Sequence, residues 1–191
     1  MNICIYGASS IKTSKEYIEA VEKLGEALAR SGHTLVFGGG ASGLMGASAR
    51  GFAKGGGKII GIAPRFFDVD GILYDKCSEF IFTDTMRERK KILDDISDVF
   101  IVCPGGVGTF DEFFEIITLK QLGRHSKEII LFNIGNYFDE LIKMMNKAFK
   151  EDFLTEKTLS LYELAKNEED VLEFIKNYKG LNSNIKDTKY I

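Results

Sequence analysis

The fold of this chain is decided by the stretch Cys103-Pro104-Gly105-Gly106-Val107-Gly108-Thr109-Phe110-Asp111-Glu112. It follows a short apolar run at 98–102 that predicts a buried strand, and a helical pattern continues from it to residue 122. Three glycines within four positions let the backbone turn tightly and approach a ligand closely. A strand, a glycine turn and a helix N-terminus aim amide groups and the positive helix end at one place, which favours phosphate. We therefore expect an anion site here, with Glu112 as an acid in the first turn of the helix.

The rest of the chain alternates between strand-like and helix-like patterns. Short apolar runs predict further strands at 2–7, 33–37, 58–62, 80–82, 128–132 and 159–162. Helical spacing predicts helices at 14–31, from the loop at 38–46 to about 54, and at 85–96, 137–149 and 168–178. This alternation predicts an α/β fold, a three-layer sandwich with helices on both faces of a mostly parallel sheet. Ligands of such sheets bind beyond the carboxyl ends of the strands.

Length and composition bound the class of protein. The 191 residues fit a single domain at 1–180 followed by a polar tail at 181–191. A net charge of -3 argues against a nucleic-acid partner held by bulk positive charge. The chain starts with a strand-like run and has no apolar segment of membrane-spanning length, so we expect neither a signal peptide nor a membrane partner. Cys4, Cys77 and Cys103 fit reduced thiols, which indicates a cytoplasmic protein.

A second glycine loop follows the predicted strand at 33–37. Its Gly38-x-Gly40-x-x-Gly43 spacing matches the dinucleotide fingerprint, but that fingerprint belongs after the first strand. The next strand also ends in Ala63-Pro64, without the acid that would hold a ribose, so an NAD or FAD enzyme is disfavoured. The absence of a phosphate-loop lysine motif disfavours an ATPase. Two alternatives stay open: a tight connection without a ligand, or a cradle for a mononucleotide or sugar phosphate shared with the Gly105 loop.

Arg89 lies in the apolar stripe of the predicted helix at 85–96. At 3.6 residues per turn the inward stripe contains Met86, Ile92, Leu93 and Ile96, with Lys90 at its edge. A buried arginine must find an anion, because an unpaired buried charge is costly. The anion is either an internal carboxylate in a structural ion pair, or a ligand phosphate or catalytic acid.

Glu112 also has two interpretations. Thr109-x-x-Glu112 matches a capping box, in which the glutamate would bond its own backbone. The following helix, however, is apolar around most of its circumference, so a carboxylate there requires a polar cavity, a cation or a raised pKa.

These motifs together resemble those of the LOG (Lonely Guy) family. They are, in matching order, Gly38-Gly39-Gly40-x-x-Gly43-Leu44-Met45-Gly46, Met86-x-x-Arg89-Lys90 and Pro104-Gly105-Gly106-x-Gly108-Thr109-x-x-Glu112. The resemblance extends from the first strand to about residue 150. It implies a Rossmann-like fold and a phosphoribohydrolase that cleaves AMP or cytokinin riboside 5'-monophosphates to a free base and ribose 5-phosphate. It also implies a homodimer with a small-molecule nucleotide as substrate.

The resemblance also assigns roles to residues. Arg89 and Glu112 match the catalytic pair of the family. The positions expected to bind substrate are Ser9, Gly39, Gly43, Met86, Lys90, Gly105, Gly106, Val107, Gly108, Thr109 and Thr118. The segment at 64–78 departs from the family pattern, and Asp68 or Asp70 is the candidate for its substrate-contacting acid.

We expect no cofactor and no metal, since His33 and His125 lie far apart in the sequence and form no ligand cluster. Two rival functions remain: a non-enzymatic nucleotide or cofactor carrier of the same fold, and a lysine decarboxylase, an old label of some family members. The decarboxylase would need a lysine for a Schiff base with pyridoxal phosphate, and no lysine stands out in that role.

Overall fold

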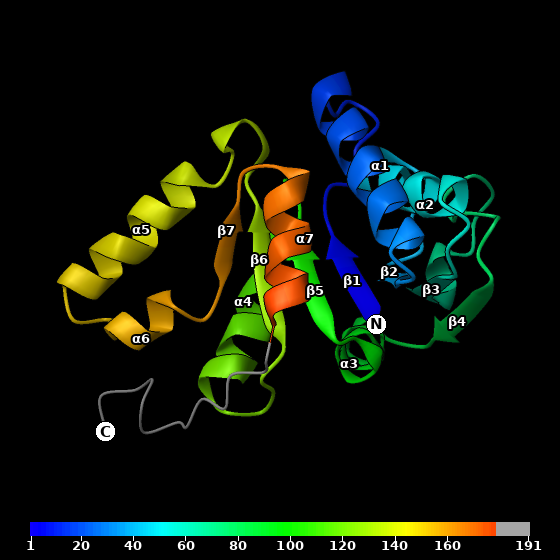
Figure 1. Cartoon of the computed structure of the whole chain (residues 1–191). Coiled ribbons are helices and arrows are strands. Elements are labelled where there is room, and N and C mark those ends of the chain that lie inside the picture. The colour runs from blue at the N-terminus through cyan, green and yellow to red at the C-terminus, as the bar shows by residue number, and fades with distance from the viewer. Residues whose placement is uncertain (179–191) are drawn as a thin grey trace.

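A computed structural model describes residues 1–178 of the protein. Its centre is one sheet of seven strands in the order β4-β3-β2-β1-β5-β6-β7 (Figure 1). Every pair of neighbouring strands in these described residues is parallel, so the predicted sheet is confirmed and is more uniform than expected. The strands are β1 (Asn2–Tyr6), β2 (Thr34–Phe37), β3 (Ile59–Pro64), β4 (Glu79–Thr83), β5 (Val99–Val102), β6 (Glu128–Phe132) and β7 (Glu163–Ala165).

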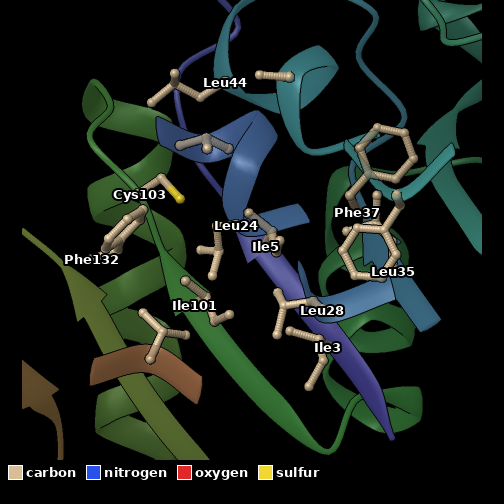
Figure 2. Packing of buried hydrophobic residues seen from close by; sticks show 14 of the residues in the cluster. Ile3, Ile5, Leu24, Leu28, Leu35, Phe37, Leu44, Ile101, Cys103 and Phe132 are labelled. Atoms are coloured by element: carbon tan, nitrogen blue, oxygen red, sulfur yellow. The ribbon is translucent and has the colours of Figure 1, made fainter. Parts of the chain in front are cut away.

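Helices cover both faces of the sheet. Alternate strand residues point to opposite faces, as Ile3 and Ile5 do against Cys4 and Tyr6 in β1. One face carries α1 (Lys15–Arg30), α2 (Gly43–Lys54) and α7 (Glu168–Asn177). The other carries α3 (Met86–Ile96), α4 (Val107–Gln121) and α5 (Asp139–Lys150). Figure 2 shows the first of these two apolar layers, where Leu24 and Leu28 of α1 pack over β1 and β5.

The strand order reverses beside β1, and this reversal positions the site. From β1 the chain proceeds outward through β2, β3 and β4, and then returns to β5 on the other side of β1. The loops that follow β1, β2 and β5 therefore meet at the carboxyl ends of these central strands, the usual place of a ligand in such folds. Backbone bonds join them there: Ala8 N donates to Pro104 O at 3.0 Å, and Leu44 N donates to Ala8 O at 2.7 Å.

One predicted strand is wrong. The run at 159–162 was expected to be a strand, but its first residue, Leu159, ends a short helix, α6 (Glu156–Leu159), and the other three form the turn before β7. Thr155 caps α6 by accepting from Thr158 N, and Leu161 is buried from the turn after it. A run of only four residues is too short for its periodicity to distinguish a strand from the end of a helix and the turn after it.

The remaining elements are two 3-10 turns, η1 (Arg65–Phe67) and η2 (Ile134–Asn136). Across residues 1–178, the helices are all too short or too polar to cross a membrane. The polar tail expected at 181–191 and the end of the expected domain at 180 lie outside the described residues. The division into one domain and a tail stays a prediction.

Candidate functional site

A cavity of about 620 Å³ opens where the loops after β1, β2 and β5 meet. Three of its walls are the loop after β1, the Gly38 loop, and the first turns of α4 with Glu112. The fourth wall is the segment from the end of η1 to β4, and α3 contributes Met86 and Arg89. Of the residues that line this cavity within the described chain, only Arg89 and Glu112 carry a charge.

Arg89 and Glu112 come from different helices and form an ion pair inside the cavity. Arg89 Nη1 lies 2.9 Å from Glu112 Oε1, and the two side chains are only 8% and 11% exposed. Arg89 Nε also donates to the carbonyl of Ile62 at the end of β3, at 3.2 Å. The expected burial of Arg89 is confirmed, and its internal carboxylate is the same Glu112 that was the candidate catalytic acid. Such a pair fixes both groups before any ligand arrives.

Gly38 makes room for this guanidinium. A Cβ at position 38 would overlap Arg89 Nη2, so a side chain there would displace the guanidinium from its present position. The Gly38 loop therefore serves the ion pair directly.

The charge of Glu112 is set by two opposing effects. Burial raises the pKa of Glu112, and the positive charge and hydrogen bond of Arg89 oppose that rise. Burial also raises the pKa of Tyr6 and raises the pKa of Cys4 to about 12, so these two neighbours on β1 stay neutral. The result is a largely buried carboxylate with Arg89 as its ion-pair partner, an arrangement typical of catalytic groups.

The N-terminus of α4 opens into the cavity beside that pair. Gly106 is the N-cap residue, and no side chain caps the helix there. A Cβ at Gly106 or Gly108 would meet no heavy atom within 4 Å, so both glycines border open space. The first-turn amides of a helix have no intrahelical partner, and with the helix dipole they suit a phosphate.

The predicted capping box at Thr109 and Glu112 is absent. α4 begins at Val107, so Thr109 is already its third residue and Glu112 lies in the second turn rather than the first. The helix therefore starts from Gly106, three residues before Thr109, which is the better capping residue. A capping box that the sequence analysis missed forms instead on α3, where Thr85 and Glu88 bond each other's backbone amides.

The structure brings seven of the expected site residues to the cavity wall: Ser9, Met86, Arg89, Gly106, Gly108, Thr109 and Glu112. The other six, Gly39, Gly43, Lys90, Gly105, Val107 and Thr118, do not line it. Their surroundings explain why. Lys90 pairs with Asp111 and Glu115 on the outer side of α4, and Thr118 is exposed further along that helix.

The segment from the end of η1 to β4 forms an apolar wall that the sequence analysis did not identify. Phe67, Ile72 and Leu73 line the cavity, whereas the expected acids Asp68 and Asp70 are exposed and do not. The segment is held against the Gly38 loop, because Ala41 N donates to Ile72 O at 2.9 Å and Tyr74 N donates to Gly39 O at 2.8 Å. The sequence signal that could have revealed this wall was the number of apolar residues in the predicted connecting segment at 64–78.

Fold and site define a class: a Rossmann-like α/β protein in which an uncapped, glycine-rich helix N-terminus and a buried Glu–Arg pair share one cavity. A family model described as "Possible lysine decarboxylase" matches residues 45–175. A cytokinin riboside 5'-monophosphate phosphoribohydrolase of Arabidopsis thaliana is 34% identical over 176 residues, covering 92% of this chain and 83% of that protein. One of Mycobacterium tuberculosis is 36% identical over 170 residues, covering 89% and 90%. The chain belongs to this family, the LOG family, as its motifs indicated.

Solved structures agree on the fold. The molybdenum cofactor carrier protein of Chlamydomonas reinhardtii superposes with a TM-score of 0.70 at 22% identity, covering 92% of this chain and 95% of that one. At this identity the likeness supports the Rossmann-like fold alone.

Proposed function

We propose that the protein is a phosphoribohydrolase that cleaves the N-glycosidic bond of AMP or an N6-substituted AMP, giving the free base and ribose 5-phosphate. The observation that carries the proposal is the Arg89–Glu112 pair, which faces the same cavity as the uncapped N-terminus of α4. The names of the two relatives described above support it, because both are named cytokinin riboside 5'-monophosphate phosphoribohydrolase.

The 5'-phosphate binds at the first turn of α4, where Gly106 and Gly108 leave space and amides point outward. The ribose then lies over the second turn, next to Glu112. As the bond between C1' and the base nitrogen breaks, positive charge develops on the sugar and the carboxylate stabilises it. Water attacks C1' and forms the new C–O bond, and its proton passes to the departing base, with Glu112 activating the water or holding the ribose hydroxyls. Arg89 keeps Glu112 in place and anchors the substrate.

The test is product analysis by chromatography after incubation with AMP and with N6-isopentenyl-AMP. Wild type should release free base, and Glu112→Gln should lose at least ~100-fold in rate, because a positioned charge typically contributes that much. Glu115→Gln is the matched control, one turn along α4 and outside the cavity, where it pairs with Lys90. Release of base from neither nucleotide, or equal rates for wild type and Glu112→Gln, would contradict the proposal.

A carrier of nucleotides or cofactors is the second candidate, favoured by the fold that the protein shares with the molybdenum cofactor carrier. It predicts that AMP raises the melting temperature without release of base. Turnover in the chromatographic assay would decide against it.

The word decarboxylase in the family description implies pyridoxal phosphate. The residues present do not fit that cofactor, because no lysine is among those that line the cavity within residues 1–178. The buried Lys120 lies on α4 near Glu128, outside the cavity wall.

We further propose a cytoplasmic homodimer without a nucleic-acid partner. Two apolar side chains beside the cavity, Ile11 and Val107, are 85% and 86% exposed, which suits contact with a second subunit. The net charge of -3 supports the absence of nucleic-acid binding, and the free cysteines support a reducing compartment. Light scattering after gel filtration would test the dimer, and a monomer at micromolar concentration would contradict it.

A further inference from the structure

One hydrogen bond from outside the cavity holds the glycine turn. Tyr137, which follows η2, donates its hydroxyl to the carbonyl oxygen of Gly105 at 2.5 Å. Gly105 lies immediately before Gly106, the N-cap of α4, and is itself not part of the cavity wall.

The geometry of the peptide links this bond to the ligand site. No cis peptide bond occurs in the described residues, so the unit joining Gly105 to Gly106 is trans. In a trans peptide the C=O and the following N–H point in opposite directions. Tyr137 does not line the cavity and Gly106 does. A carbonyl fixed toward Tyr137 therefore directs the Gly106 amide away from Tyr137 and toward the cavity.

This peptide needs to be fixed more than most. It lies between two glycines, and a peptide plane with no flanking Cβ can rotate at little steric cost. The preceding carbonyl, of Pro104, is already held by the amide of Ala8 at 3.0 Å. Tyr137 supplies the equivalent restraint for the next carbonyl.

The tyrosine is itself held in position. Asn133 Oδ1 accepts from Phe138 N at 2.6 Å, and Asn133 Nδ2 donates to Asp139 Oδ1 at 2.9 Å, which fixes the loop between β6 and α5. The ring of Tyr17 on α1 meets the Tyr137 ring edge-on, with centroids 6.4 Å apart. Elements from both faces of the sheet thus place one hydroxyl against the glycine turn.

We propose that Tyr137 is a positioning residue for the phosphate site. It sets the Gly105–Gly106 peptide so that the Gly106 amide donates to the 5'-phosphate. The inference rests on the proposed function only in taking the ligand to be a nucleoside 5'-monophosphate, and it concerns binding rather than bond cleavage.

The experiment compares Tyr137→Phe with wild type by calorimetric titration with AMP and with adenosine, which lacks the phosphate. The variant keeps the ring and loses only the hydroxyl. AMP binding should weaken about tenfold, the effect of one hydrogen bond to a charged group, while adenosine binding stays the same. The matched control is Tyr178→Phe, which removes a hydroxyl that donates to the Ser126 carbonyl outside the cavity wall, and it should bind AMP as wild type does.

A merely structural role would lower the melting temperature and weaken AMP and adenosine alike. That result, or unchanged AMP binding in Tyr137→Phe, would overturn the proposal, as would a wild type that binds no AMP. If AMP binding weakens selectively but wild type releases no base, the positioning role stands and the hydrolase proposal fails. If wild type cleaves AMP and Tyr137→Phe binds AMP as well as wild type does, the hydrolase proposal stands and the positioning role fails.

Discussion

The two glycine loops look alike in sequence and differ in what surrounds them. Each follows a buried strand and opens a helix. In the first loop the absent side chains make room for the protein itself: Arg89 lies against Gly38, Phe80 against Gly39, and the Ala8 carbonyl against Gly43. In the second loop Gly105 also lies against the protein, at Thr109, but Gly106 and Gly108 face open space. A glycine motif alone therefore does not reveal a ligand site. The atoms that would meet a Cβ distinguish a glycine that allows close packing from one that borders open space.

The largest effect on stability should come from Gly43→Ala. Gly43 has φ +58, and an added Cβ would overlap the Ala8 carbonyl oxygen. We expect a loss of roughly 3 kcal/mol in the free energy of unfolding, from backbone strain and overpacking together. Urea unfolding measures it, with Gly106→Ala as the comparison, since that backbone has φ -93 and the site is open. Equal midpoints for the two variants would remove the distinction between the loops.

Gly38→Ala should act on activity through Arg89. The added methyl group displaces the guanidinium from Glu112, and we expect kcat/KM for AMP to fall about 100-fold, as when a positioned charge is lost. The double variant Gly38→Ala with Arg89→Met should be no worse than Arg89→Met alone, because both changes act on one group. Additive losses would mean that Gly38 acts independently of the ion pair.

The pH dependence of kcat/KM depends on both loops. Arg89 lies against Gly38 of the first loop, and its partner Glu112 lies on the helix that follows the second. Burial raises the pKa of Glu112, and the ionised form is the one proposed to act, so kcat/KM should fall as the pH drops through a value above that of an ordinary glutamate. Displacing Arg89 in Gly38→Ala removes the opposing charge, which raises the pKa of Glu112 further and moves this acidic limb to higher pH. Rates between pH 4 and 8 measure it. A limb that does not move would show that Arg89 still faces Glu112.

The smallest effect should come from Gly108→Ala in the second loop. Alanine favours the helix over glycine, so the free energy of unfolding should rise by about 0.5–1 kcal/mol. AMP binding should weaken, because the methyl group occupies the space proposed for the phosphate. Thermal unfolding and calorimetric titration measure the two effects. Unchanged AMP binding would place the phosphate elsewhere.

The sequence predicted the parts of the site that depend on periodicity. Arg89 was expected in the buried stripe of its helix, and it is buried there. The start of α4 was not predictable, because Thr109 is a better capping residue than Gly106 and yet the helix begins at Val107. The apolar wall at Phe67, Ile72 and Leu73 and the bond from Tyr137 depend on contacts between segments distant in the chain, and no local pattern encodes them.

The pairing of Arg89 with Glu112 determines what the loss of this one carboxylate would do to the protein. The guanidinium is buried against the Ile62 carbonyl, and within residues 1–178 Glu112 is the carboxylate that pairs with it. A mutation that removed this carboxylate would leave a cation that only an incoming anion could satisfy. A single substitution would therefore abolish turnover while strengthening the retention of a phosphorylated ligand, which is a short route from a hydrolase to a storage protein.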